Sequence, residues 1–163
     1  MTAIRRLALL FAVLLLQGCS EEPYNYSESL RQQINQLELA LNQGESDAVL
    51  DAVAADFRSE HFPDRRQLSL FMLRQRRQHS RITLRSGPAV IQVQFVSEDQ
   101  SKAATIITAT ASFQSLLTGG GGWLPHSGQF YHFVTHWRWR DNAKEGNEWE
   151  LVEAQWKEVF EPR

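Results

Sequence analysis

The chain has 163 residues with 17 basic and 19 acidic side chains, and its formal charge is −2 at pH 7. This length suits one domain with a sizeable hydrophobic core, and the mildly acidic balance argues against nucleic acid as a partner, because nucleic-acid binding requires a basic surface. The chain contains a single cysteine, which excludes a disulfide within the monomer, so packing alone must stabilise the fold.

The first 19 residues predict where the protein works. Arg5 and Arg6 precede an unbroken apolar run at residues 7–16, and Gly18 and Cys19 follow it. A basic start, an apolar stretch of about 7–15 residues and a small residue before the cut form a secretory signal. The run is too short for a transmembrane helix, which needs about 20 apolar residues. The ending Leu-Gln-Gly-Cys resembles the lipobox of bacterial lipoproteins; an ordinary secretory signal with a chance cysteine is the alternative.

The lipobox resemblance implies an anchor as well as an address. Residues 1–18 are then a signal peptide that is cut between Gly18 and Cys19, and Cys19 carries acyl chains such as palmitate. Ser20 after the cysteine implies sorting to the outer membrane, so we expect a lipid-anchored cell-envelope protein that faces the periplasm. Residues 19–26 are the expected lipidated tether, of which the polar part spans at most about 25 Å. The mature chain carries a charge of −4, since the signal takes two arginines and no acids.

Residues 27–57 predict two helices joined by a tight turn. Apolar side chains recur at helical spacing in both: Leu30, Ile34, Leu37 and Leu41, then Val49, Leu50, Val53 and Phe57. We expect Ser27 to cap the first helix and Gly44 to end it in a left-handed conformation. Ser46 or Asp47 is the expected cap of the second helix.

A connector at residues 58–63 leads to a third predicted helix. Asp64, with Gln67 three residues later, is a variant of the capping box. The last turns carry cations, which favour the carboxyl end of a helix. Together with two later arginines they form one basic cluster, either a solvated helix end or a contact for anionic headgroups: Arg74, Arg76, Arg77, Arg81 and Arg85.

After residue 80 the pattern is that of strands, at residues 81–85, 89–96, 102–117, 129–140 and 148–160. A loop with four consecutive glycines occupies residues 118–128. Strand 129–140 alternates between one face with Tyr131, Phe133, Thr135, Trp137 and Trp139 and another with His132, His136 and Arg138. Trp149 and Trp156 stand at opposite parity, which predicts a bulge between them if both face the core.

Helices followed by strands indicate an α+β fold. The layout resembles the NTF2-like (SnoaL-like) cone over residues 27–160. The helix hairpin at residues 37–57 and the final strand pair, with Trp137-Arg138-Trp139 and Trp149-Glu150-Leu151-Val152, carry the likeness. The resemblance implies three N-terminal helices packed in a curved, mainly antiparallel four-stranded sheet, with a pocket at its open end. Many members have a β-hairpin between the second and third helices, for which the connector here is too short.

Candidate pocket residues are Tyr131, His132, His136 and Trp123. The two histidines share a strand face about 13 Å apart, too far to bind one metal ion, so we expect no metal and no cofactor. Trp123 follows the glycine run and either covers the pocket mouth, contacts a partner or membrane, or packs on the sheet. The Asp base and the Tyr/Asp donors of the steroid-isomerase branch have no match in this sequence.

The sequence favours a lipid-anchored binding module over an enzyme and leaves catalysis open. The expected ligand is a small apolar molecule or a protein partner of the envelope. One alternative is a pocket enzyme of isomerase or dehydratase type. The other is a homodimer, formed through an open sheet face rich in Trp and Tyr.

Overall fold

The computed structural model describes residues 24–77, 83–97, 105–118, 129–141, 143 and 146–159. These residues contain three helices: α2 (Tyr26–Gln43), α3 (Ser46–Asp51) and α4 (Arg65–Arg77). They also contain six strands: β1 (Val53–Ser59), β2 (Thr83–Ser86), β3 (Val90–Ser97), β4 (Thr105–Thr118), β5 (Gln129–Trp139) and β6 (Trp149–Glu158). No helix in this part of the chain is long and apolar enough to span a membrane. The predicted signal peptide and Cys19 lie outside the described residues.

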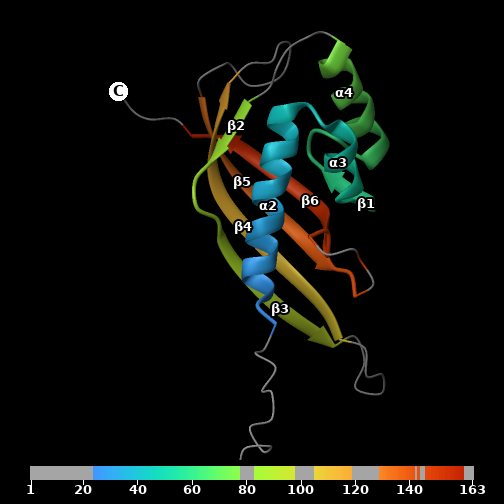
Figure 1. Ribbon diagram of the computed structural model, residues 1–163, viewed down its shortest axis with the longest axis vertical. Helices are drawn as coiled ribbons and strands as arrows, with labels where there is room; N and C mark the ends of the chain where they lie inside the picture. Colours follow the sequence, from blue (N-terminus) through green and yellow to red (C-terminus); the bar gives the residue numbers. More distant parts are fainter. Residues whose placement is uncertain are drawn as a thin grey trace, which may run out of the picture.

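One mixed sheet runs in the order β1-β6-β5-β4-β2, and β3 also pairs with β4. Strand β4 is long enough to hold both short strands on one edge: β3 pairs with its residues 105–112 and β2 with its residues 115–118. The pairings are antiparallel except that of β1 with β6, which is parallel. Helix α2 lies across one face of the curved sheet, and α3 and α4 lie beside β1 (Figure 1).

The predicted second helix is wrong in its second half. Helix α3 ends at Asp51, and β1 replaces the helix that we expected up to Phe57. Val53 and Phe57 are both buried, and a spacing of four residues puts two side chains on one face of a helix and of a strand alike. Pairing with β6 decides the outcome, because it satisfies backbone groups of an otherwise open edge. The described sheet has six strands where the resemblance implied four, because β1 is added and residues 81–96 form two strands, β2 and β3.

The helix ends confirm part of the predicted capping. Gly44 ends α2 with φ of 77°, and the Asp64 carboxylate accepts a 2.8 Å hydrogen bond from the Gln67 amide at the start of α4. The other two caps are wrong. Asn25, whose side chain accepts from the Glu28 amide, takes the place of Ser27. Glu45 precedes α3 without a side-chain cap, because neither Ser46 nor Asp47 stands outside the helix.

The predicted bulge in the last strand is confirmed. Pairing of β5 with β6 passes from His136 opposite Glu153 to Trp137 opposite Leu151, so Val152 is an extra residue. The extra residue reverses the parity of β6. As a result Trp149, which is fully buried, and Trp156 both belong to the core side of the sheet.

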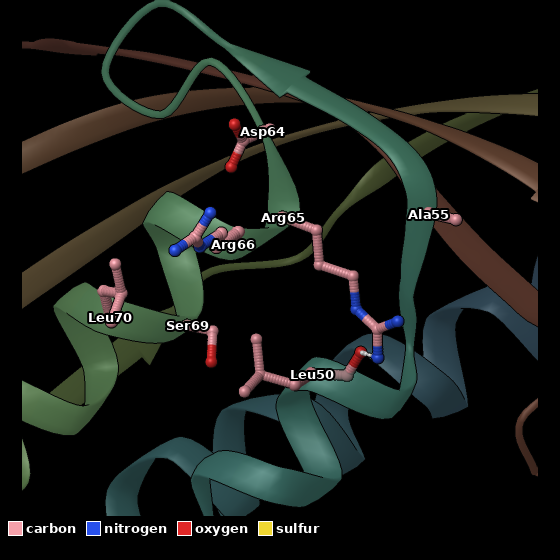
Figure 2. A pocket seen from close by; sticks show the side chains of 7 residues that line it. All are labelled: Leu50, Ala55, Asp64, Arg65, Arg66, Ser69 and Leu70. Atoms are coloured by element: carbon pink, nitrogen blue, oxygen red, sulfur yellow. Dashed lines mark hydrogen bonds between the residues drawn. The ribbon is translucent and has the colours of Figure 1, made fainter.

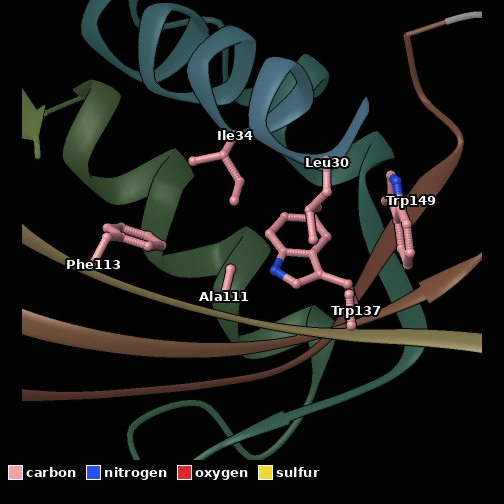
Figure 3. Close-up of a cluster of buried hydrophobic side chains, with 7 residues drawn as sticks. Leu30, Ile34, Ala111, Phe113, Trp137 and Trp149 are labelled. Carbon is pink, nitrogen blue, oxygen red and sulfur yellow. The ribbon is translucent and has the colours of Figure 1, made fainter. Parts of the chain in front are cut away.

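The main core lies between α2 and the sheet (Figure 3). Leu30 and Ile34 of α2 pack against a group of sheet residues: Ala109, Ala111, Phe113, Trp137 and Trp149. The alanines leave room for the helix and for the large rings beside it. Each large apolar side chain buried here contributes about 1.5–3 kcal/mol. A second cluster joins β1, α4 and β6 around Val53, Phe57, Phe62 and Ala154.

Candidate functional site

The predicted alternation of β5 is confirmed, and it separates the candidate pocket residues. Tyr131 is 4% exposed and lies on the face that carries the core. His132 and His136 are half-buried and lie on the opposite, outer face. The structure therefore does not bring Tyr131 and the histidines into one site. Trp123 lies outside the described residues.

Each histidine of the outer face has a cross-strand hydroxyl partner on β4. His132 Nε2 lies 3.2 Å from Ser112 Oγ, and His136 Nδ1 lies 3.1 Å from Thr110 Oγ1. No group of three His, Cys, Asp or Glu side chains within the described ranges is arranged to hold a metal ion. The histidines thus belong to a polar outer surface. The predicted homodimer would use an open sheet face rich in Trp and Tyr, but Trp137 is buried on the inner face. The homodimer itself stays a prediction.

Arg138 joins three strands on the outer face. Its Nε donates to Glu150 of β6 at 2.5 Å, and its Nη atoms donate to both carboxylate oxygens of Asp56 of β1 at 3.1 and 2.9 Å. The bidentate hydrogen bonds from Arg138 lower the pKa of Asp56, and the same contacts raise the pKa of Arg138. Sequence reasoning placed Arg138 on this face but missed Asp56, which lies 82 residues away and was assigned to a helix.

Tyr131 occupies the inner face at the start of β5. It is paired with Ser115 of β4 and Glu158 of β6 in the sheet. Burial raises the pKa of the Tyr131 phenol, and the Glu158 carboxylate adds to the effect. The phenol is therefore neutral at physiological pH.

A recess of about 480 Å³ opens between α3, β1 and α4 (Figure 2). Its walls combine apolar and polar side chains: Leu50, Ala55, Asp64, Arg65, Arg66, Ser69 and Leu70. Two of the polar groups have structural partners, since Arg65 donates to the Leu50 carbonyl at 2.9 Å and Asp64 caps α4. The volume falls within the 300–1,000 Å³ typical of small-molecule sites. Sequence reasoning missed this recess because it placed no strand opposite α4.

Arg66 and Ser69 supply hydrogen-bond donors to the recess. Arg66 is exposed and makes no ion pair or hydrogen bond with another described residue, while Ser69 stands one turn further along α4. Figure 2 shows the Arg66, Ser69, Leu50 and Leu70 side chains around the open space. The arrangement offers an apolar surface with hydrogen-bond donors at one side. It suits an amphipathic molecule that carries an oxygen acceptor or an anionic group.

A smaller recess of about 240 Å³ lies between α2, α3 and the turn before β6. It is lined by the polar side chains of Gln33, Gln36 and Asn147 together with apolar ones such as Leu37. Gly146 closes one side with φ of 82°, and a Cβ there would meet the Gln36 side chain at 3.4 Å. Neither recess is lined by Tyr131, His132 or His136.

No protein-family model matches the sequence, and no curated protein does. Solved structures do resemble it. An NTF2-like protein from Cytophaga hutchinsonii is 11% identical, with a TM-score of 0.58 over 83% of this chain and 100% of its own. An NTF2-like protein with a cystatin-like fold from Novosphingobium aromaticivorans is 17% identical, with a TM-score of 0.56 over 91% of this chain and 86% of its own. ActVI-ORFA from Streptomyces coelicolor is 12% identical, with a TM-score of 0.52 over 84% and 97%.

At these identities the likeness shows the fold alone. The described domain has the NTF2-like α+β fold, which often forms ligand-binding pockets. Its mixed sheet of six described strands replaces the four-stranded one that the resemblance implied.

Proposed function

We propose that this chain is a lipid-anchored cell-envelope protein whose NTF2-like domain is a binding module for a small, largely apolar ligand or for a protein partner. The Leu-Gln-Gly-Cys sequence after a basic and apolar start supports the anchor. The recess between α3, β1 and α4 supports a binding role, because its volume of about 480 Å³ suits a small ligand.

The observation that carries the binding role is the recess between α3, β1 and α4. Leu50, Ala55 and Leu70 give it an apolar surface, and Arg66 and Ser69 offer donors beside that surface. A ligand with a hydrocarbon chain and a carboxylate or carbonyl group would match both the apolar surface and the donors. Dodecanoate is a simple probe of this chemistry, since its chain matches the leucines and its carboxylate matches Arg66.

The experiment measures dodecanoate binding by calorimetry and by the rise in melting temperature of the purified protein. Leu70 is 37% exposed and lines the recess, whereas Leu39 is 57% exposed on α2 and does not. We expect Leu70→Glu to weaken binding several-fold and Leu39→Glu to leave it unchanged. Equal binding by both variants, or no binding of dodecanoate and no co-purified ligand in native mass spectrometry, would refute a small-ligand role for the recess.

The anchor has a separate test. We expect the full chain to incorporate radiolabelled palmitate and to fractionate with membranes, and Cys19→Ala to do neither. The alanine variant removes the only cysteine of the chain. A variant that still sediments with membranes would refute the acyl anchor while leaving the ligand experiment unaffected.

A further inference from the structure

Aromatic rings gather at the end of the domain where α2 begins. Tyr24 lies 4.8 Å from Tyr26 and 5.1 Å from Trp139 between ring centroids. Tyr26 lies 5.1 Å from Trp139 and 5.7 Å from Phe95, which stands near the end of β3. These four rings, Tyr24, Tyr26, Phe95 and Trp139, are called the aromatic end below. They join the chain entry to two strands of the sheet.

The aromatic end leaves large apolar side chains exposed to solvent. Phe95 is 61% exposed and Tyr24 is 51% exposed, and Val96, on the opposite face of β3, is 44% exposed. Contiguous exposed apolar side chains mark interaction surfaces more often than scattered ones do. The indole N–H of Trp139 donates to Asp141 at 2.9 Å, so the rings adjoin a polar rim. Rings with one apolar side and one polar edge suit the boundary between acyl chains and headgroups.

The described part of the chain begins at Tyr24, and this determines which end of the domain lies near an acyl anchor at Cys19. Tyr24 follows Cys19 by five residues, which span at most about 18 Å. Helix α2 has 18 residues and is therefore about 27 Å long. When its axis points away from the membrane, the C-terminal end of α2 is farther from Cys19 than the five-residue segment can span. An acylated Cys19 thus brings the aromatic end, before any other described part, to the lipid surface.

On a zwitterionic leaflet, charge does not decide the orientation of the domain. At the start of α2, Arg31 and Glu28 neutralise each other in an ion pair of 2.9 Å. The basic residues Arg74 and Arg77 lie at the end of α4, and Figure 1 shows α4 at the end of the domain opposite to the start of α2. The aromatic end therefore requires no anionic lipid and fits a zwitterionic interface.

We propose that the aromatic end inserts into the headgroup boundary of the leaflet that holds Cys19, and so sets the orientation of the domain on the membrane. This inference rests on the acyl anchor of the proposed function. It fixes α2 with its N-terminus toward the lipid and directs α4 and the recess beside it toward the aqueous side.

The test uses the lipidated full chain in phosphatidylcholine vesicles. Acylation occupies the sulfur of the only native cysteine, so Phe95→Cys supplies a single free thiol for a nitroxide spin label. Leu73→Cys on α4 is the matched control, because Leu73 is 44% exposed at the other end. We expect collisions with a water-soluble nickel chelate to be several-fold fewer at position 95 than at 73, and collisions with oxygen to be more frequent at 95.

Val96→Cys provides a second probe at the same end, and circular dichroism verifies that each variant is folded. The protection at position 95 should persist at high salt. Vesicle flotation is recorded on the same samples. Floating protein with equally accessible labels at 95 and 73, or with protection at 73 instead, overturns the orientation and leaves the anchor intact. Protein that does not float refutes the anchor and the orientation together.

Discussion

The side-chain amide of Gln33 bonds to the backbone of Trp149 on both sides. Gln33 Oε1 accepts from the Trp149 N–H at 2.9 Å, and Gln33 Nε2 donates to the Trp149 carbonyl at 2.5 Å. Gln33 is 2% exposed and Trp149 is fully buried. A glutamine on the core side of α2 thus takes the place of a neighbouring strand for the first residue of β6, and it fixes the helix against the sheet.

Replacing this amide should cost stability. Gln33→Ala leaves the Trp149 N–H and C=O buried without partners, and each unsatisfied group costs about 1–3 kcal/mol. We expect a loss of about 2–5 kcal/mol in the free energy of unfolding, measured by urea denaturation. Gln32→Ala is the control, because Gln32 is exposed and its change should stay within about 0.5 kcal/mol. Equal stability of the two variants would contradict the role of Gln33.

The bidentate contact between Arg138 and Asp56 predicts a pH-dependent contribution. The lowered pKa of Asp56 means that its contribution is complete above the ordinary value of about 3.9 and is lost as the pH falls through the lowered value. Because Asp56 is 59% exposed, solvent screening keeps the contribution below about 1 kcal/mol.

Asp56→Asn should therefore lower stability at pH 7 and make little difference near pH 2, as measured by urea unfolding at both pH values. Asp51→Asn is the control, since Asp51 is exposed and has no ion pair among the described residues. A deficit of the Asp56 variant that is the same at both pH values would show that the charge is not the cause.

Substitutions at two glycines test separately the effect of a left-handed backbone and the effect of space for a Cβ. Gly44 has φ of 77°, and no atom lies within 4 Å of the place that a Cβ would take, so Gly44→Ala adds only the cost of a left-handed backbone, about 1–2 kcal/mol. Gly87 has an ordinary φ, and a Cβ there would contact the Gln114 carbonyl oxygen at 3.6 Å. We expect Gly87→Ala to be neutral or slightly stabilising. Thermal unfolding of both variants tests the difference, and a larger loss at Gly87 would reverse the assignment.

The extra residue in β6 predicts the effect of a deletion. Removing Val152 shortens the separation of Trp149 and Trp156 from seven residues to six, so both rings share one face of a regular strand that needs no bulge. We expect the deletion variant to keep cooperative thermal unfolding and near-ultraviolet circular dichroism, as Val152→Ala does. A deletion variant that loses cooperative unfolding, or that exposes either tryptophan to acrylamide, would contradict this account of the bulge.

Local patterns predicted most of the elements but not the strand that builds the recess. The stripe from Leu30 to Ile34 and the alternation around Trp137 are local signals, and both identify buried faces correctly. Val53 and Phe57 fit a helix and a strand equally well, and their pairing with β6 depends on residues about 100 positions away. Local spacing carries no information about such a contact.

The candidate site was predictable to a smaller degree. Alternation assigned Tyr131 and the two histidines to opposite faces, so the prediction that all three line one pocket conflicted with the strand pattern itself. The recess with Arg66 and Leu70 depends on α3, β1 and α4 meeting in space. Since the residues of β1 were predicted to be helical, the sequence did not identify the neighbours of α4, and nothing local placed Arg66 beside Leu50.

Strand β4 has a further consequence for the behaviour of the protein at high concentration. Its one edge is shared by β2 and β3, and Gly87 and Pro88 interrupt the chain between them, with the Gly87 amide donating to the Gln114 carbonyl at 2.8 Å. The outermost rim on this side consists of two short pieces, and the proline has no N–H to offer. An incoming chain finds no continuous template there, which opposes the addition of a strand at this edge of the sheet.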